Sequence, residues 1–132
     1  MVASVKPFLM FQEGKAAEAM DFYASLFPHC AIDEIVRYGP DEAGPEGTVM
    51  LARFHIGDQS ILCIDSPVTH AFTFTPSLSL FVECESEAQI REIYAALSEG
   101  GEELMALADH GFSREFAWVN DRFGVSWQLN LK

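Results

Sequence analysis

Residues 121–132 read Asp-Arg-Phe-Gly-Val-Ser-Trp-Gln-Leu-Asn-Leu-Lys, and this stretch gives the strongest indication of the fold. After the Asp-Arg-Phe-Gly turn, apolar residues alternate with the polar residues Ser126, Gln128 and Asn130. The alternation predicts a strand with one face in the core and one face of hydroxyl and amide groups. A polar strand face turns either to water or into a ligand cavity. Gln128, at the centre of that face, is therefore a candidate ligand contact.

The composition predicts one globular domain. The chain has 132 residues, 49% of them hydrophobic, and its 8 basic and 20 acidic residues give a net charge of -12. A chain of this length buries about two-thirds of its unfolded surface. We expect neither nucleic acid nor an anionic membrane surface as a partner, because both require a face rich in lysine and arginine.

Neither a signal peptide nor a membrane span is predicted. The first seven residues lack a basic region followed by an apolar one, and no apolar run approaches the ~20 residues of a span. The three cysteines, Cys30, Cys63 and Cys84, are widely spaced and form no CxxC motif. This pattern is typical of reduced thiols in a cytoplasmic protein rather than of a disulfide framework or a zinc site.

Hydrophobic periodicity predicts eight strands and two helices. A first helix of about fourteen residues follows Glu13-Gly14-Lys15 and ends before Pro28. The second helix opens with the capping box Ser86–Gln89 and ends at Gly100-Gly101. The strands are expected at residues 5–12, 31–38, 48–56, 59–65, 78–83, 103–108, 115–120 and 125–131.

The order of these elements repeats, since βαβββ occurs twice. The helical segment Tyr23-Ala24-Ser25-Leu26 resembles Tyr94-Ala95-Ala96-Leu97, about half a chain later. We therefore predict a single α+β domain, residues 1–132, built of two βαβββ modules at about residues 1–68 and 76–132. Their curled mixed sheets would each pack a helix on one face and turn the other face to a shared cavity. The alternative is a loose α+β sandwich in which the two amphipathic helices are alike by chance.

The repeat and two motifs resemble the vicinal oxygen chelate superfamily of glyoxalases, dioxygenases and antibiotic-resistance proteins. Within it, the chain is similar to the PhnB-like group, often labelled 3-demethylubiquinone 3-methyltransferase-like. The motifs are Pro7-Phe8-Leu9-Met10-Phe11 leading into Glu18-Ala19-x-x-Phe22-Tyr23, and Asp121-x-Phe123-Gly124-x-x-Trp127-Gln128. The resemblance covers nearly the whole chain and implies a glyoxalase-like fold.

The resemblance also implies where a metal would bind. Metal-dependent members of the superfamily take His, His and Glu ligands from inward positions on the first strand of each module and on the last strand of a module. Here the first strand offers Lys6, Phe8, Leu9 and Met10, the fifth offers Ser77 and Ser79, and the last places Gln128 where a glutamate is expected. These residues do not balance the charge of a divalent ion. We predict no metal at this site and no cofactor.

Other chemistry finds little support in the sequence. His29, His70 and His110 fall in turns or loops, and His55 shares a strand face with Arg53. A methyl donor is usually held by a glycine-rich turn of a doubly wound sheet, which this chain lacks, so methyl transfer is not predicted. Cys63 is expected to be an inert buried thiol, because no cation lies near it in sequence to lower its pKa.

We expect a metal-free protein that binds a small-molecule ligand. The predicted pocket is an aromatic body with a few hydrogen-bonding groups, and Trp127 is assigned to the core instead. Its candidate lining residues are Phe8, Cys63, Ser79, Phe81, Trp118 and Gln128.

Two alternatives stay open at this point. One is a divergent lyase, isomerase or dioxygenase that uses a relocated metal or an acid–base pair such as Asp65 and Glu83. The other is an interaction module whose cavity is filled by its own side chains. The resemblance also implies a homodimer, because superfamily members commonly pair their sheets about a two-fold axis.

Overall fold

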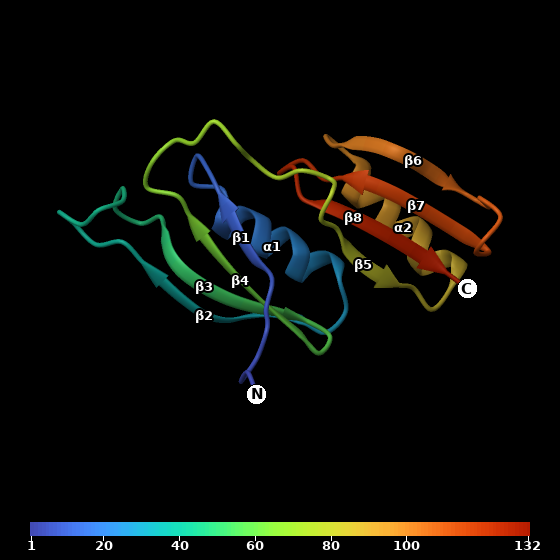
Figure 1. Cartoon of the computed structure of the whole chain (residues 1–132), viewed down its shortest axis with the longest axis horizontal. Helices are drawn as coiled ribbons and strands as arrows, with labels where there is room; N and C mark the ends of the chain where they lie inside the picture. The colour runs from blue at the N-terminus through green and yellow to red at the C-terminus, as the bar shows by residue number, and fades with distance from the viewer. The chain divides into compact units, whose positions relative to one another are not determined.

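The computed structural model describes residues 1–132, and the chain divides into two units, Met1–Ala71 and Phe72–Lys132. Each unit contains four strands and one helix in the order βαβββ (Figure 1). Both sheets are mixed. The predicted α+β class with two βαβββ modules is therefore confirmed.

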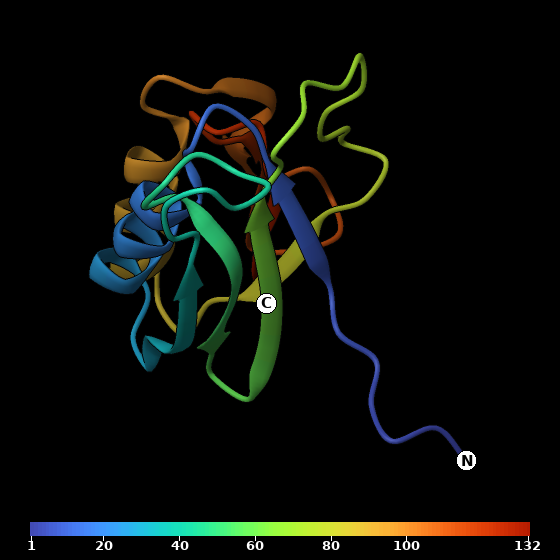
Figure 2. The same ribbon diagram turned by 90° about the vertical axis from the view of Figure 1, so that its left-hand side faces the viewer.

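The first unit contains β1 (Phe8–Phe11), α1 (Ala16–Leu26), β2 (Cys30–Arg37), β3 (Val49–Ile56) and β4 (Gln59–Asp65). Its strand order is β1-β4-β3-β2. The β1–β4 pair is parallel, whereas the other two pairs are antiparallel. Figure 2 shows α1 on one face of this sheet. The opposite face is not covered by a helix of its own unit.

The second unit repeats this arrangement with β5 (Leu80–Glu83), α2 (Glu87–Ser98), β6 (Glu102–Ala108), β7 (Glu115–Asn120) and β8 (Ser126–Leu131). Its strand order is β5-β8-β7-β6, and β5 is parallel to β8. In both units the last strand of the module therefore lies between the first strand and the third. We call the sheet face away from the unit's own helix the open face.

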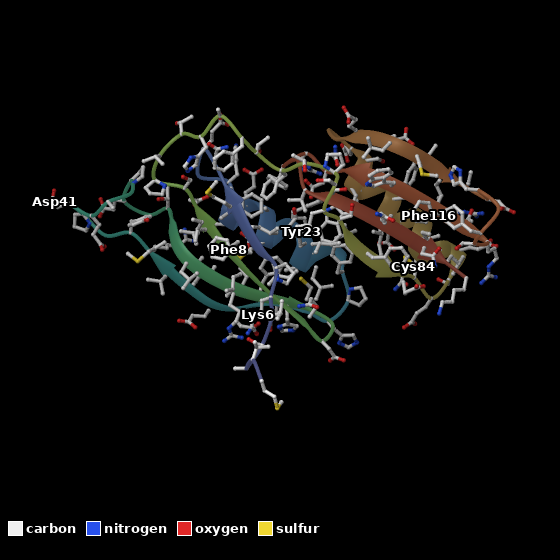
Figure 3. The ribbon with its side chains drawn as sticks, viewed as in Figure 1. Lys6, Phe8, Tyr23, Asp41, Cys84 and Phe116 are labelled. Atoms are coloured by element: carbon white, nitrogen blue, oxygen red, sulfur yellow. The ribbon has the colours of Figure 1, made fainter.

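The core of the first unit lies between α1 and one sheet face. Leu9, Cys63 and Ala52 are neighbours on β1, β4 and β3, and all three are buried. Tyr23 of α1 is also fully buried, and its ring centroid lies 6.0 Å from that of Phe54 of β3 (Figure 3). The apolar stripe predicted for this helix is therefore its core-facing side.

The core of the second unit is built on the apolar face of β8. Trp127 is 1% exposed and lies opposite Val119 of β7. The neighbouring pair is Leu129 and Ala117, also fully buried, and α2 packs against β7 and β8. The assignment of Trp127 to the core is confirmed.

The turn that enters β8 is held by one buried carboxylate. Asp121 is 2% exposed, and its Oδ1 accepts the backbone N–H groups of Phe123 at 2.8 Å and Val125 at 3.1 Å. Its Oδ2 accepts the indole N–H of Trp127 at 2.9 Å. Gly124 has a φ of 91°, which favours glycine. The Asp-x-Phe-Gly-x-x-Trp motif therefore builds this turn and fastens it to the core.

The two helices begin in different ways. At α2, Ser86 Oγ accepts the N–H of Gln89 at 3.1 Å, as the predicted capping box requires. The Gln89 side chain accepts the N–H of Glu85 at 2.8 Å, one residue before the expected partner. At α1 the N-cap side chain makes no such bond, and Asp65 Oδ1 of β4 accepts the N–H of Ala16 at 2.8 Å instead.

Three elements differ from prediction by two residues or more. β1 begins at Phe8 rather than at residue 5, because Pro7 has no N–H for the ladder. β5 begins at Leu80 rather than at residue 78, since Leu78 is bonded back to Thr75 in a turn at 3.4 Å. α1 has 11 residues rather than about fourteen, because the residue before Pro28 is held extended.

Two of the four outer strands, β2 and β6, are irregular. β2 changes register against β3 between Ile32 and Glu34, so that Asp33 is an additional residue in the strand. β6 changes register against β7 on both sides of Met105. Such bulges redirect side chains on an outer strand. Neither helix of the fold has the length and apolarity that crossing a membrane requires.

Candidate functional site

The open face of the second unit carries a polar strand between aromatic residues. In register, Gln128 of β8 lies beside Phe81 of β5 and Trp118 of β7. Side chains directly opposite in neighbouring strands point to the same face. Phe81 is 55% exposed, a large apolar surface for a side chain on a sheet. The sheet therefore brings Phe81, Trp118 and Gln128, three of the predicted pocket residues, together.

Ser79, a fourth predicted residue, joins one end of this face. Its Oγ lies 2.7 Å from the Oγ of Ser126, which also accepts the indole N–H of Trp118 at 2.9 Å. Ser126 is 2% exposed. These bonds hold the Trp118 ring in one orientation. Both serine hydroxyl groups are thereby hydrogen-bonded within the unit.

The other end of the face is closed by a second network. Asn130, buried on β8, donates to the Glu83 carboxylate at 3.1 Å and accepts a hydrogen bond from Ser113. Beside it, Phe116 is covered by Phe112 in an edge-to-face contact with ring centroids 4.9 Å apart. The loop before β7 therefore folds over this end.

Gln128 differs from its two neighbours on the strand. Ser126 and Asn130 are buried and bonded to side chains of their own unit. The half-buried amide of Gln128 makes no hydrogen bond within the chain. One donor and one acceptor group are therefore free at the centre of the face.

Two predicted pocket residues belong to the first unit, and they lie on opposite faces of its sheet. Phe8, 53% exposed, is on the open face, next to Leu62. Cys63 is fully buried on the face that packs against α1, next to Leu9. Cys63 therefore does not line the open face, because the adjacent position along β4 points to the other side of the sheet.

The bulge in β2 creates a charged cluster on the open face of the first unit. Asp33 accepts a hydrogen bond from His55 Nδ1 at 2.9 Å and lies 3.5 Å from Arg53. Arg53 also lies 4.0 Å from the Glu34 carboxylate. The position of His55 beside Arg53 agrees with the sequence. The carboxylate partner was not predicted, because the extra residue shifts the alternation of β2.

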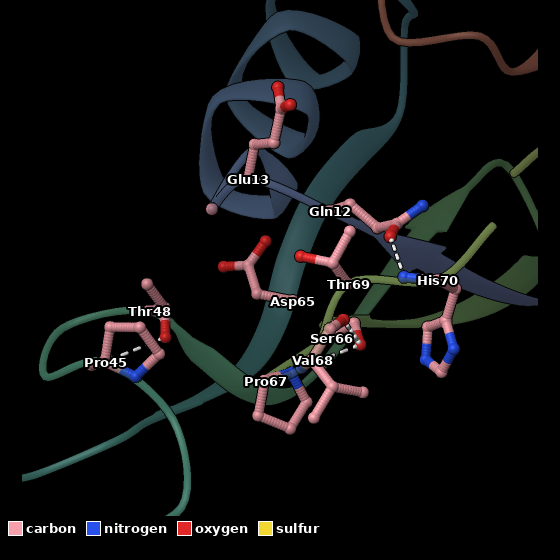
Figure 4. A pocket seen from close by; sticks show the side chains of 11 residues that line it. Gln12, Glu13, Pro45, Thr48, Asp65, Ser66, Pro67, Val68, Thr69 and His70 are labelled. Carbon is pink, nitrogen blue, oxygen red and sulfur yellow. Dashed lines mark hydrogen bonds between the residues drawn. The ribbon is translucent and has the colours of Figure 1, made fainter.

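The first unit also contains a cavity of about 500 Å³, lined by residues 12–14, 45, 48 and 65–70 (Figure 4). Several of its polar groups bond to each other. Thr48 donates to the Pro45 carbonyl at 2.7 Å, and the Gln12 side chain accepts the N–H of His70 at 2.8 Å. Sequence reasoning missed this cavity because three separate loops form its wall.

Asp65 lies in this cavity wall but has a structural role. It is 3% exposed, and its two oxygens accept the N–H groups of Ala16 and Val49, each at 2.8 Å. Both oxygens are thus bound to the backbone. The Glu83 carboxylate, by contrast, is exposed and binds Asn130. An acid–base role for Asp65 finds no support in this geometry.

The three thiols are free and protected. Burial, with a smaller contribution from the Asp65 charge, raises the pKa of Cys63 from 9.0 to about 12. Burial and the nearby carboxylates Asp33 and Glu83 raise the pKa of Cys30 and Cys84 to about 11. Each thiol is therefore neutral at physiological pH and a poor nucleophile.

We expect these thiols to react slowly with a disulfide reagent at pH 8, and Cys63 to be the slowest. Unfolding in urea should restore the rate of an ordinary thiol. The raised pKa values stabilise the fold fully below pH about 9, and this contribution is lost as the pH rises towards 11 or 12. A native-state rate for Cys63 equal to that of free cysteine would contradict the assignment.

The comparison with known proteins identifies the family. The sequence profile of the family described as 3-demethylubiquinone-9 3-methyltransferase matches residues 3–130. The chain belongs to this family. No match is found among the curated proteins.

Two solved structures are similar to this chain over nearly its whole length. A PhnB protein from Bacillus cereus is 49% identical, with 98% of this chain and 99% of that chain covered and a TM-score of 0.94. A protein from Pseudomonas aeruginosa is 25% identical, with 99% and 98% covered and a TM-score of 0.84. The PhnB-like resemblance seen in the sequence is confirmed.

A more distant match shares the fold of the chain. A mutant of the fosfomycin resistance protein FosX from Listeria monocytogenes, in complex with Mn(II) and a dihydroxypropylphosphonic acid, is 10% identical. It covers 98% of this chain and 93% of that chain with a TM-score of 0.66. At this level of identity the match supports the fold alone, and the predicted glyoxalase-like fold is confirmed.

The metal that the superfamily implies does not fit the residues at the corresponding positions. The open-face positions on β1 are Phe8 and Met10, and those on β5 and β8 include Phe81 and Gln128. Nowhere in the chain do three or more His, Cys, Asp or Glu side chains lie close enough to hold a metal ion. This member of the family thus offers neutral or apolar groups where a divalent ion needs anionic or imidazole ligands.

Proposed function

We propose that the protein is a metal-free small-molecule binding protein whose ligand lies on the open face of the second unit. Gln128 would bind the ligand by hydrogen bonds, Phe81 and Trp118 would contact its apolar surface, and Ser79 would fix Trp118 through Ser126. The proposal assigns no catalytic step to the chain.

The free amide of Gln128 is the observation that carries this proposal. A polar strand face that served only the fold would be satisfied internally or turned fully to water. Here the two neighbouring polar side chains are satisfied, whereas Gln128 lies half-buried between aromatic residues with its amide unpaired. Binding sites commonly combine such an apolar lining with a few directed polar groups.

A thermal-shift screen of uncharged, cationic and anionic small molecules tests the proposal. A ligand that binds only the folded chain raises the unfolding temperature. We expect at least one compound to do so, and we expect Gln128→Ala to abolish that shift. The substitution alone should move the unfolding temperature by no more than about 2 °C, because the amide makes no internal bond.

Gln59→Ala is the matched control for the screen, because Gln59 is an exposed strand residue whose side chain bonds only to the neighbouring carbonyl of Ser60. This variant should keep the ligand shift. A screen in which no compound stabilises the unmodified protein would contradict the proposed function.

Elemental analysis of the purified protein separates this proposal from a relocated metal centre. We expect less than stoichiometric zinc, manganese or iron after gel filtration. One divalent ion per chain that is lost in Glu83→Gln and retained in Gln128→Ala would favour a metal-dependent enzyme instead.

We further propose that the protein is a cytoplasmic homodimer. The three unpaired cysteines support a reducing compartment, and the superfamily resemblance supports the dimer. Sedimentation equilibrium at micromolar concentration should give twice the chain mass of 14.7 kDa. A monomer at that concentration would remove the dimer from the proposal.

A further inference from the structure

The ligand class follows from the chemistry of the open face, if the proposed function holds. We infer that the second unit binds a planar ring compound, uncharged or cationic, that presents an N–H donor beside a carbonyl acceptor. Lactams and ring carboxamides have this edge. Three independent features of the face support this class.

The first feature is the spacing of the aromatic side chains. Phe81 and Trp118 lie on the two strands that flank β8, so their backbones are separated by two strand spacings, about 10 Å. The bond from the Trp118 indole to Ser126 holds that ring on the face. A flat ring placed over Gln128 can contact an aromatic side chain on each side, whereas a branched aliphatic group matches neither flat surface.

The second feature is the pattern of free polar atoms. The Gln128 amide offers an N–H₂ donor next to a carbonyl acceptor, and both are unpaired within the chain. A lactam edge presents the complementary pair, an acceptor next to a donor. Further along the face, Asn120 lies opposite Ser126, and its Oδ1 is buried with no hydrogen-bond partner. Because this oxygen is shielded from the surface of the face, it does not contribute to the choice of ligand.

The third feature is the charge of the sheet. Strands β5, β6, β7 and β8 contain no lysine or arginine. Glu83 and Glu102, in register with Asn130 and Asn120, contribute carboxylates at opposite ends of the face. Phosphonates and carboxylates require cationic or N–H-rich partners, so this sheet disfavours anionic ligands. A positive group on the ligand would be favoured near Glu83.

Three related compounds test the inference on the full chain: 2-quinolone, its N-methyl derivative and quinoline-2-carboxylate. All are flat bicyclic rings, but the second lacks the N–H donor and the third is anionic. Binding is followed in ¹⁵N-labelled protein through the two indole N–H signals, which are assigned with Trp118→Phe. Trp127, bonded to Asp121 in the core, serves as the internal reference.

We expect 2-quinolone to shift the Trp118 and Gln128 side-chain signals and to leave Trp127 unchanged. Its Kd should be at least about tenfold lower than those of the other two compounds. The N-methyl derivative leaves the Gln128 carbonyl unpaired, and the carboxylate is repelled by the negative charge of the sheet. Gln128→Glu should raise the Kd of 2-quinolone by about tenfold or more. Gln59→Glu, at an exposed position of β4, should leave this Kd unchanged.

The outcomes separate the inference from the proposed function. Equal or tighter binding of quinoline-2-carboxylate at Trp118, or a Kd unaffected by N-methylation, overturns the ligand class and leaves small-molecule binding intact. No binding of any ring compound, with a positive thermal-shift screen, also overturns the class alone. A negative screen together with unchanged Trp118 and Gln128 signals overturns both.

Discussion

Asp121→Ala is expected to lower the free energy of unfolding by about 3–5 kcal/mol, because it leaves three donors without their acceptor. The donors are the N–H groups of Phe123 and Val125 and the indole N–H of Trp127. The loss is large because the carboxylate is 2% exposed and water cannot replace it without opening the turn. Urea denaturation followed by tryptophan fluorescence measures the change.

Two variants refine this measurement. Asp121→Asn keeps an oxygen for the two backbone donors but places an N–H₂ group against the indole, so it should cost about half as much. Asp109→Ala removes a similar local bond, to the N–H of Gly111 at 2.8 Å, at an exposed position and should cost about 0.5 kcal/mol or less. An Asp121→Ala loss no greater than that of Asp109→Ala would show that the turn does not depend on its carboxylate.

Asp65→Ala is expected to destabilise the protein by about 2–4 kcal/mol, since two buried backbone donors lose their partner. These donors start α1 and β3, so the substitution loosens two elements at once. Native-state hydrogen exchange should show the largest loss of protection at Ala16 and Val49. Asp65→Asn should lower the free energy of unfolding by roughly half as much as Asp65→Ala, because one oxygen acceptor remains.

Asp21→Ala is the control for this second prediction. Asp21 is an exposed acidic residue of the same helix, and its removal should change the stability by about 0.5 kcal/mol or less. Protection loss spread evenly over α1, β3 and the second unit would contradict the local role of Asp65.

Local sequence signals predicted the parts of the fold that are held by local bonds. The capping box at Ser86 needs only residues within one helical turn, and the alternation in β8 has one clearly apolar and one clearly polar set. The class of fold, the repeat and the core position of Trp127 could be predicted for this reason.

Long-range bonds and strand irregularities could not be predicted. Asp65 caps a helix that begins 49 residues earlier in the chain, so no short motif records the contact. In β4, Leu62 and Ile64 are as apolar as Ile61 and Cys63, and the sequence therefore does not show which set faces the helix. This ambiguity placed Cys63 in the predicted pocket.

The family motif at the C-terminus also has a different meaning once its bonds are known. Asp121, Gly124 and Trp127 determine the turn and its attachment to the core. The side chain of Gln128, in contrast, makes no hydrogen bond within the chain. Variation at Gln128 would therefore leave the fold unchanged and, under the proposed function, alter the ligand, whereas variation at Asp121, Gly124 or Trp127 affects stability first.

The irregular register of β2 and β6 has a consequence for the behaviour of the chain in concentrated solution. A regular outer strand exposes a row of unpaired N–H and carbonyl groups that can recruit a strand from another molecule. The additional residue at Asp33 and the interruptions around Met105 break that row in one of the two outer strands of each sheet, β2 and β6. Both strands also carry acidic side chains, and the net charge of -12 adds mutual repulsion between molecules. The same bulges that distort the sheets thus protect the protein against aggregation through the β2 and β6 edges.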